Sequence, residues 1–371
     1  MSTTQLEQVP VTVISGPLGA GKTTLVNRLL SNPGDRRLAV IVNDMGEVNI
    51  DAELIESEAD DEGIVDLSNG CICCRLQGDL LDQARRLATD REFDHLVVEA
   101  SGISEPLPIA QTLTRGVDED ADPPEAYRLD AVVSVIDAYG FWKAFDPEES
   151  LPEAAPDPER PLTDVLVDQI EFCNVLLLNK CDMVPDDALD EIEATIRELQ
   201  PEADLYRTTY SDIDPGLVLG TGQFDLAAAK RTPGWKQALA GDGHDGHDHS
   251  ESAAERHGVE STIYRASRPF DPVSFADWLD EWEGNVVRAK GFTWVTSRPE
   301  EVLGVSQAGP SVQAGPIGEW GEDEPLTKLV FIGRDLDTDR LRTELDECLA
   351  PEGWDAETAL SSREDPFPRE N

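Results

Sequence analysis

Two short segments of this chain carry residues whose types and spacing suit specific chemistry. Residues 16–23 read Gly-Pro-Leu-Gly-Ala-Gly-Lys-Thr, the pattern of a phosphate-binding loop. Residues 71–74 read Cys-Ile-Cys-Cys, which places three thiols in four positions. A chain with both can couple the hydrolysis of a nucleotide to the holding or release of a soft metal ion.

The first segment predicts a site for phosphates. Its glycines let backbone N–H groups turn inward, and the N-terminus of a following helix favours negative charge. We expect Lys22 to reach the β- and γ-phosphates and Thr23 to ligate Mg²⁺. The full set expected to hold the nucleotide's phosphates is Gly16, Gly19, Ala20, Gly21, Lys22, Thr23 and Thr24.

A second phosphate-facing element is predicted after the apolar run that ends at residue 99. Glu99 could hold the Mg²⁺ shell or position water, and Gly102 would let the backbone approach the γ-phosphate. With Lys22 and Thr23, these two residues form the predicted catalytic set.

Residues 179–182, Asn-Lys-Cys-Asp, match the Asn-Lys-x-Asp pattern of GTP-binding proteins. The carboxylate of Asp182 could accept two hydrogen bonds from the N1–H and the exocyclic amine of guanine. Adenine offers the wrong donors and would leave that charge unpaired. Asn179 and Lys180 would brace the loop and cover the base. The pattern favours GTP over ATP and disfavours a small-molecule kinase.

The thiol cluster predicts a metal site. Cys71, Cys73 and Cys74 fall in a loop before an expected helix, where the helix dipole and Arg75 lower the pKa of a thiol. Thiolates bind Zn²⁺ or Co²⁺. Neighbouring Cys73 and Cys74 cannot easily both chelate, so Cys71 with either is the favoured pair, and Glu47 or water is the candidate fourth ligand. Redox chemistry and inert packing are the alternatives.

A second group of metal-binding side chains lies in residues 241–249, Gly-Asp-Gly-His-Asp-Gly-His-Asp-His. His244, His247 and His249 could capture a transition metal weakly, as an accessory site. The alternative interpretation is an acidic linker that happens to contain histidines.

Alternating apolar runs predict the elements that position these groups. Strands are expected over residues 9–15, 38–43, 94–99, 131–137, 175–179 and 204–207, and helices over 22–30, 75–88 and 185–199. Such alternation favours an α/β fold of the P-loop NTPase type, with a doubly wound parallel sheet covered on both faces. Within these strands, we interpret His95 as a packed or solvent-facing residue and Asp137 as structural.

The charge of the chain excludes some partners. The 371 residues include 76 acidic and 30 basic side chains, for a net charge of −46. Nucleic acid and anionic membranes are poor partners for such a surface, and the acidity indicates a halophilic cytoplasm, where salt screens the repulsion. The polar residues 1–8 lack the pattern of an export signal, and no apolar run spans a bilayer, so a cytoplasmic location is expected.

These motifs, in this order, resemble the CobW family of P-loop GTPases, which includes zinc-regulated metallochaperones. The resemblance rests on residues 16–24, 43–47, 71–74, 99–102 and 179–182. It implies that Glu47 lies in a switch loop near both nucleotide and metal. It also implies a smaller C-terminal α+β domain that begins near Val259. Local patterns agree, because they predict strands over 261–266, 286–295 and 328–333 and helices over 272–282 and 338–349.

The resulting domain prediction is a GTPase domain over residues 1–235, a His/Asp-rich linker over 236–257, a CobW-type C-terminal domain over 258–351 and a loose polar tail over 352–371. The expected function is a GTP-hydrolysing metallochaperone that delivers a metal, zinc before cobalt, to a client metalloprotein. A cobalt-handling protein for cobalamin synthesis, an activator of a metalloenzyme with structural zinc, and a metal sensor or store are the alternatives. The sequence leaves the oligomeric state open.

Overall fold

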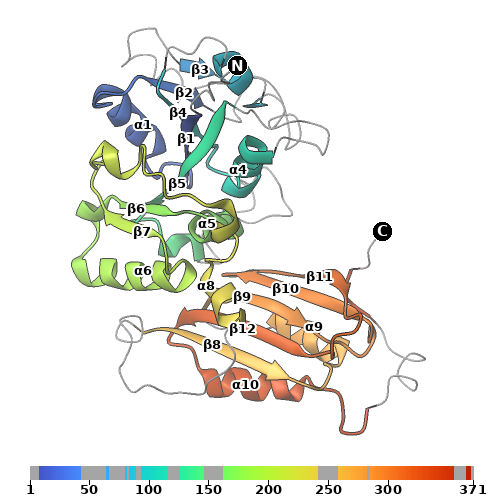
Figure 1. Ribbon diagram of the computed structural model, residues 1–371. Coiled ribbons are helices and arrows are strands. Elements are labelled where there is room, and N and C mark those ends of the chain that lie inside the picture. Colours follow the sequence, from blue (N-terminus) through green and yellow to red (C-terminus); the bar gives the residue numbers. More distant parts are fainter. Residues whose placement is uncertain are drawn as a thin grey trace, which may run out of the picture. The chain divides into compact units, whose positions relative to one another are not determined.

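A computed structural model describes residues 8–42, 64–66, 80–81, 83–88, 93–115, 126–145, 162–240, 258–281, 285–354 and 365–368. The chain divides into two compact units, the first made of Met1–Phe141, Ala155–Leu189 and Glu202–Thr232, and the second of Trp142–Ala154, Asp190–Pro201 and Pro233–Asn371 (Figure 1). Within the described ranges, no helix has the length and apolar character needed to cross a membrane.

A seven-stranded sheet forms the centre of the first unit. Its strands are β1 (Val9–Ser15), β2 (Leu38–Val42), β3 (Ile64–Asp66), β4 (His95–Glu99), β5 (Tyr127–Asp137), β6 (Val175–Asn179) and β7 (Asp204–Arg207). They lie in the order β3-β2-β4-β1-β5-β6-β7, and every neighbouring pair is parallel. All carboxyl ends therefore meet at one edge, where ligands of such sheets bind.

Helices and short 3₁₀ turns connect these strands and follow them. They are α1 (Lys22–Ser31), α4 (Pro106–Arg115), η1 (Trp142–Phe145), α5 (Leu162–Glu171), η3 (Cys181–Met183), α6 (Asp186–Leu199), η4 (Pro215–Leu217), α7 (Leu226–Ala229) and α8 (Gly234–Ala240). Helix α1 lies on one face of the sheet and α4 on the other (Figure 1). The apolar face of α1, with Leu25, Val26 and Leu29, packs in the same core cluster as Ile14 of β1.

The final loop of the first unit is attached to its first strands. The Thr12 hydroxyl on β1 donates a hydrogen bond to the Val218 carbonyl at 2.9 Å. The carboxylate of Asp130, which is fully buried on β5, accepts the backbone N–H groups of Thr221 and Gly222 at 2.9 and 2.8 Å. These contacts hold the chain beyond β7 against the central strands.

The second unit contains a five-stranded antiparallel sheet in the order β11-β10-β9-β12-β8. Its elements are β8 (Val259–Ala266), α9 (Pro272–Glu281), β9 (Val286–Thr293), β10 (Glu301–Ala308), β11 (Ser311–Glu319), β12 (Thr327–Arg334) and α10 (Thr338–Glu347). Phe275 of α9 and Leu341 and Leu345 of α10 pack with inward side chains of the sheet, such as Phe331, in one core cluster. The unit is an α+β domain, as the resemblance implied.

Most of the predicted elements are confirmed, with small changes at their ends. Strands β1, β6 and β7 have the predicted bounds, whereas β5 begins four residues earlier, at Tyr127. The sequence prediction missed α4, α5, β3 and the β10–β11 hairpin. The hairpin carries Gly304, Gly315 and Pro316, which weaken the local signal for a strand.

Two features differ from the predicted domain boundaries. Helix α8 runs through residue 235, so the expected start of a linker at residue 236 lies inside a helix. The expectation of a loose tail is wrong for Asp365–Pro368, because Phe367 belongs to the core cluster of the second unit and is 7% exposed. Predictions for the insertion at 146–161 and the segment 241–257 lie outside the described residues.

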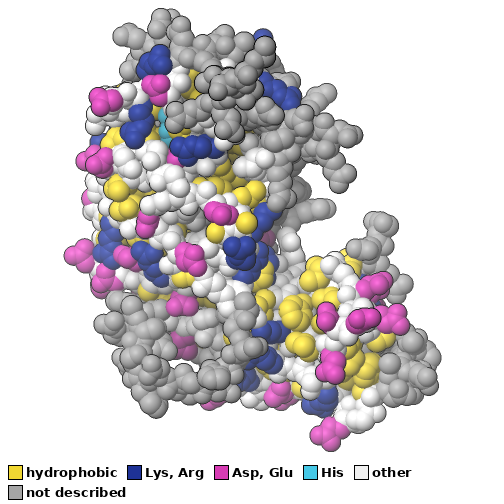
Figure 2. Space-filling view, viewed as in Figure 1, with side chains coloured by type: hydrophobic (Ala, Val, Ile, Leu, Met, Phe, Trp, Pro, Cys, Tyr) yellow, Lys and Arg dark blue, Asp and Glu magenta, His cyan; other side chains and the backbone are white. Residues whose placement is uncertain are grey.

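The charged side chains of the described residues lie dispersed over the face seen in Figure 2, with both signs present. On this face, the acidic side chains therefore mark no single site.

Candidate nucleotide site

The phosphate-binding loop lies between β1 and α1, at the carboxyl edge of the sheet. Gly21 has φ +112°, and a Cβ there would lie 2.4 Å from Nδ2 of Asn179, so only glycine fits. Lys22 begins α1 and is 6% exposed, and its ammonium donates to the Pro17 carbonyl at 3.1 Å. A buried ammonium held within the loop gives this turn a fixed positive charge for an anion.

Thr23 and Glu99 meet beside the loop. The Thr23 hydroxyl donates to Oε1 of Glu99 at 2.9 Å, and Glu99 is 2% exposed at the end of β4. The hydroxyl and the carboxylate are hard oxygen donors of the kind that Mg²⁺ prefers. Thr23 lies on α1, which follows β1, and Glu99 ends β4. Because β1 and β4 are adjacent parallel strands, the two residues meet across 76 residues of sequence.

The turn after Glu99 lies directly against the phosphate-binding loop. A Cβ at Gly102 would be 2.7 Å from the backbone nitrogen of Leu18, so a larger residue would push the two loops apart. The buried amide of Gln169 on α5 donates to the carbonyls of Gly102 and Ser104 at 3.3 and 3.1 Å. Gln169 thus attaches this turn to helix α5.

Asn179, at the end of β6, connects the phosphate-binding loop to the loop after β7. Its Nδ2 donates to the Ala20 carbonyl at 2.8 Å. Its Oδ1 accepts the Ser211 backbone N–H at 2.8 Å and the Thr208 hydroxyl at 3.1 Å. The Ser211 hydroxyl in turn donates to the Gly21 carbonyl at 3.0 Å. One buried amide therefore orders both loops.

The loop after β7 is held in a strained conformation. Tyr210 and Ser211 have φ +53° and +54°, in the left-handed region that residues with side chains rarely adopt. Arg28 of α1 holds this loop, since its Nε donates to the Tyr210 carbonyl at 2.7 Å and its Nη1 pairs with Asp212 at 2.8 Å. Strain that persists through such support is a feature of functional sites.

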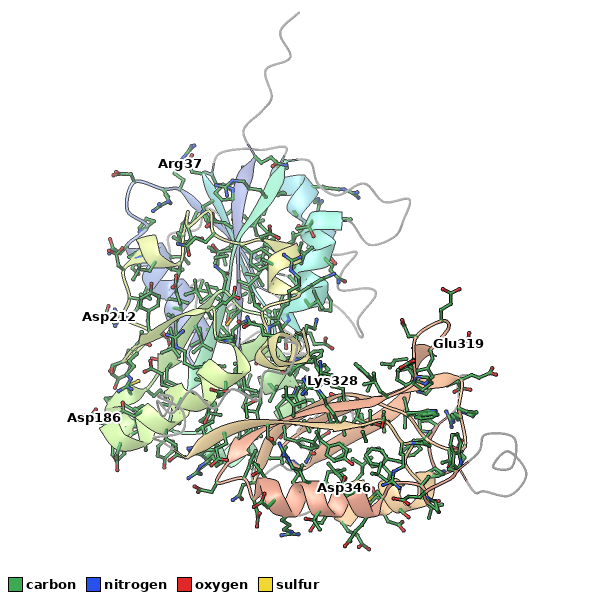
Figure 3. The ribbon with its side chains drawn as sticks, turned by 60° about the horizontal axis from the view of Figure 1, so that its bottom comes forward. Arg37, Asp186, Asp212, Glu319, Lys328 and Asp346 are labelled. Atoms are coloured by element: carbon green, nitrogen blue, oxygen red, sulfur yellow. The ribbon has the colours of Figure 1, made fainter. Side chains whose placement is uncertain are left out.

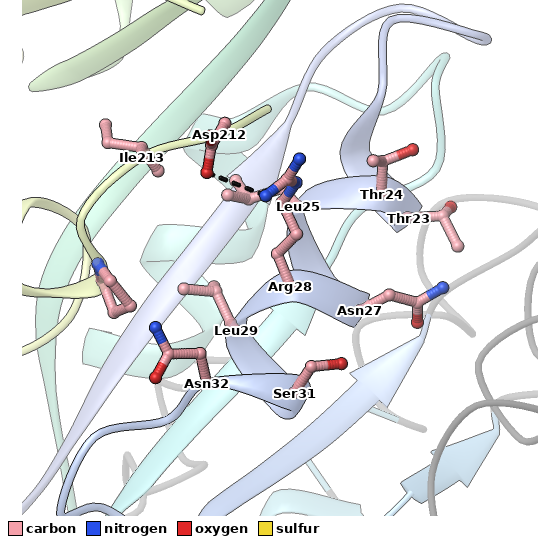
Figure 4. Close-up of a pocket in the computed structure, with 11 residues that line it drawn as sticks. Thr23, Thr24, Leu25, Asn27, Arg28, Leu29, Ser31, Asn32, Asp212 and Ile213 are labelled. Carbon is pink, nitrogen blue, oxygen red and sulfur yellow. Dashed lines mark hydrogen bonds and ion pairs between the residues drawn. The ribbon is translucent and has the colours of Figure 1, made fainter. Parts of the chain in front are cut away.

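A cavity of about 440 Å³ lies along α1 beside this loop (Figure 4). Thr23 and Thr24 border one end, and Arg28 and Asp212 form a bridge within it. Figure 3 shows Asp212 at the surface of the unit. The cavity is therefore lined in part by Thr23 and Thr24 of the phosphate-binding segment.

The remaining members of the predicted base-binding segment lie at the same edge. Lys180 has φ +61°, and its ammonium pairs with Oδ2 of Asp137, at the end of β5, at 2.7 Å. Asp137 also accepts the Tyr139 N–H at 3.0 Å, which fits the structural role expected for it. Asp182 is exposed in η3, where its carboxylate is open to a ligand.

His95 is packed within the sheet. It is fully buried on β4, and its Nε2 lies 2.9 Å from the Thr12 hydroxyl. Because that hydroxyl donates to Val218, Nε2 must be the protonated nitrogen, and Nδ1 is left as a buried acceptor with no hydrogen-bond partner among the described residues. Burial lowers the pKa of His95 to about 4.

The predicted metal ligands lie outside the described residues. These are Cys71, Cys73, Cys74, Glu47, His244, His247 and His249. Within the described ranges, no group of three or more His, Cys, Asp or Glu side chains could hold a metal ion. Of the cysteines that the structure describes, Cys173 and Cys348 are buried and Cys181 is half-buried.

Four supporting residues were missed from the sequence: Arg28, Gln169, Thr208 and Ser211. The contacts of Arg28, Gln169 and the Ser211 hydroxyl join positions 65 to 190 residues apart. Thr208 and the Ser211 N–H contact Asn179, which lies 29 and 32 residues away. The order Thr-Thr-Tyr-Ser directly after the short run 204–207 was the available signal, because polar residues that follow a parallel strand lie at the ligand edge.

Comparisons with known proteins agree with this arrangement. Residues 10–207 match the profile of the CobW/HypB/UreG nucleotide-binding domain, and residues 259–349 match that of the cobalamin synthesis protein cobW C-terminal domain. The chain is 38% identical over 387 residues to the zinc-regulated GTPase metalloprotein activator 1 of Dictyostelium discoideum, covering 92% of this chain and 80% of that protein.

Two further proteins are similar over most of the chain. The zinc chaperone CobW of Pseudomonas aeruginosa is 30% identical over 366 residues, which cover 93% of this chain and 92% of that protein. The crystal structure of Zn(II)-bound YjiA GTPase from E. coli is 23% identical, covers 93% of this chain and 100% of that one, and has a TM-score of 0.41.

Proposed function

Because the chain belongs to the CobW/HypB/UreG family, we propose that it is a GTP-hydrolysing metallochaperone that delivers zinc to a client metalloprotein. The relatives reported above are named as a zinc-regulated GTPase activator and a zinc chaperone. The proposal that the chain binds GTP rests on the hydrogen bonds of Asn179 to Ala20 and Ser211. They connect the phosphate-binding loop to the loop after β7, which would lie beside the base.

In this proposal the residues of the P-loop and its neighbours bind GTP. Lys22 supplies positive charge to the β- and γ-phosphates, and Asp182 accepts the two donors of guanine. Thr23 and Glu99 would hold Mg²⁺, which fits their oxygen donors and would neutralise charge on the phosphates. Gly102 lets the turn after β4 approach the γ-phosphate, and Gln169 keeps that turn in place.

The cargo in this proposal is a transition-metal ion held by Cys71, Cys73 and Cys74, with Glu47 as a further ligand. In the sequence, Glu47 and the thiols lie between β2 and β4, and β4 ends at Glu99 beside Thr23. If the segment between β2 and β4 changes conformation between the GTP-bound and GDP-bound states, the geometry of the thiolates changes with it. The metal affinity must then differ between the two states, because otherwise hydrolysis could not drive release.

We place this activity in the cytoplasm, where a cluster of free thiols stays reduced. A salt-rich cytoplasm would screen the net charge of −46. Cobalt is the second candidate cargo, because thiolates bind both ions.

A second candidate function is the activation of a metalloenzyme, favoured by the name of the Dictyostelium relative. In that case the zinc would be structural and would not exchange. One experiment separates the two: the zinc affinity of the protein is measured by competition with a chromophoric chelator, without nucleotide, with GDP, and with a slowly hydrolysed GTP analogue and Mg²⁺. A difference of tenfold or more between the two nucleotide states supports delivery, and equal affinities rule it out.

A further inference from the structure

Lys180, the second residue of the predicted base-binding segment, is held by a carboxylate from the neighbouring strand. Its ammonium pairs with Oδ2 of Asp137, the last residue of β5, at 2.7 Å. The two side chains are partly buried, with exposed fractions of 32% and 22%. Lys180 also has φ +61°, in the left-handed region that lysine rarely adopts. Both the backbone and the ammonium of this residue are therefore constrained.

The loop after β5 is shaped around the carboxylate of Asp137. Its Oδ1 accepts the Tyr139 backbone N–H at 3.0 Å. A Cβ at Gly140 would lie 3.3 Å from Oδ2, so glycine leaves room for this oxygen. The Ala138 N–H donates to the Asn179 carbonyl at 2.9 Å, which attaches the loop directly to the base-binding segment. The loop thus presents the carboxylate in one orientation.

A second carboxylate lies within reach of the same ammonium. Asp182 follows Lys180 by two residues and is exposed in η3. Its carboxylate is the group expected to accept the two donors of guanine. Because opposite charges attract strongly at short distance, an ion pair between Lys180 and Asp182 would occupy the acceptor that selects the base. The contact of Lys180 with Asp137 removes this competition.

We propose that Asp137 is a positioning residue for guanine selection, which holds the Lys180 ammonium away from Asp182 and keeps that carboxylate available for the base. This inference rests on the GTP site proposed above, and it adds to the structural role of Asp137 within its own loop. Because Asp137 acts through Lys180, its effect should disappear when the ammonium is absent. It should also concern the base and leave the phosphates unaffected.

The test measures the dissociation constants of the full-length chain for slowly hydrolysed analogues of GTP and ATP and for inorganic tripolyphosphate, by calorimetry with Mg²⁺ in 1 M KCl. Asp137→Asn keeps the shape of the side chain and an acceptor for Tyr139, but it removes the charge that holds the ammonium. We expect the GTP analogue to bind about fivefold more weakly, the scale of a partly exposed ion pair. Tripolyphosphate should bind as before, within about twofold, because it contacts the phosphate-binding loop alone.

A double-mutant cycle with Lys180→Met shows whether Asp137 acts through the ammonium. Methionine keeps an apolar stem but carries no charge. In this background, adding Asp137→Asn should change the affinity for the GTP analogue by less than about twofold. Asp186→Asn is the matched control, because Asp186 is exposed at the start of α6 (Figure 3). It should bind the GTP analogue as the wild-type chain does.

Three results would overturn the proposal. They are a wild-type affinity for the GTP analogue in Asp137→Asn, an equal loss of GTP analogue and tripolyphosphate, which would indicate general damage to the site, and a loss that persists in the Lys180→Met background. A wild-type chain without preference for GTP over ATP would instead overturn the base site on which the proposal rests. The zinc affinity of the wild-type chain in its two nucleotide states tests metal delivery separately.

Discussion

Asn179 and Ala20 lie 159 residues apart in sequence, yet the side-chain amide of the first donates to the carbonyl of the second at 2.8 Å. The same side chain accepts the N–H of Ser211. The phosphate-binding loop and the loop that would face the base are therefore ordered by one residue. Asn179 should therefore affect nucleotide affinity mainly by ordering these two loops, and less through any contact that it makes with the nucleotide itself.

Asn179→Ala should raise the dissociation constant for GTP by about 10- to 100-fold. The variant leaves the Ala20 carbonyl and the Ser211 N–H without their partner, and each such loss costs about 1–3 kcal/mol. Titration with a fluorescent GTP analogue measures the effect. Asn32→Ala, an exposed asparagine at the end of α1, is the matched control and should change the affinity less than twofold. Equal losses in both variants would contradict the bridging role.

Glu99→Gln should slow GTP hydrolysis by about 100- to 1,000-fold, comparable to the loss of one preorganised electrostatic contact. The variant keeps the shape of the side chain and an acceptor for Thr23 but removes the negative charge. The Mg²⁺ concentration for half-maximal hydrolysis should rise at least tenfold. Phosphate release at varied Mg²⁺ measures both effects, with exposed Glu202→Gln as the control. An unchanged Mg²⁺ dependence would show that Glu99 takes no part in holding the ion.

Lys22→Ala and Cys73→Ala should separate the two halves of the proposed function. The lysine variant should hydrolyse no GTP but bind zinc without nucleotide as the wild-type chain does. The cysteine variant should bind GTP normally and lose tight zinc binding, because a thiolate is removed. Cys348→Ala, which changes a buried thiol in the second unit, is the control for the cysteine change. Wild-type zinc affinity in the Cys73 variant would exclude this thiol as a ligand.

The stability of the first unit should fall as the pH drops from about 6.5 toward about 4. The unfolded chain protonates His95 near pH 6.5, whereas burial holds the pKa of the folded residue at about 4. The stabilisation from the neutral form is thus fully present above pH 6.5, and about 3 kcal/mol is lost by pH 4. Urea unfolding at several pH values, at constant high salt, measures it. His95→Leu should show a shallower decline over the same range, and an identical slope would exclude His95 as the cause.

Added salt should stabilise the protein. The net charge of −46 causes self-repulsion that falls as the Debye length shrinks from about 10 Å at 0.1 M to about 3 Å at 1 M. We expect the midpoint of thermal unfolding to rise between 0.1 and 2 M KCl. Some salts, such as sulfates, also strengthen apolar burial and would obscure the effect of screening. The comparison therefore uses two chloride salts, KCl and tetramethylammonium chloride, at equal ionic strength. A flat response to both salts would argue against adaptation to a saline cell interior.

Local patterns predicted the parts of the fold whose causes are local. The apolar runs at 9–15 and 175–179 are buried parallel strands. The glycines between β1 and α1, followed by Lys22 at the start of α1, identify the phosphate-binding loop directly. The roles of Gln169 and Ser211 could not be read in this way, because each acts on backbone groups far away in the sequence. The docking of Phe367 was hidden for the same reason, since a polar, proline-containing tail gives no sign of a pocket elsewhere.

The attachment of Val218 to Thr12 has a consequence for how the first unit unfolds. Thr12 lies on β1, and Val218 shares a core cluster with Ile14 of the same strand, so β1 and the loop after β7 pack together across 206 residues of sequence. Detaching this loop would expose buried side chains of a central strand to water. Strand β1 and the loop should therefore lose their structure in one cooperative step.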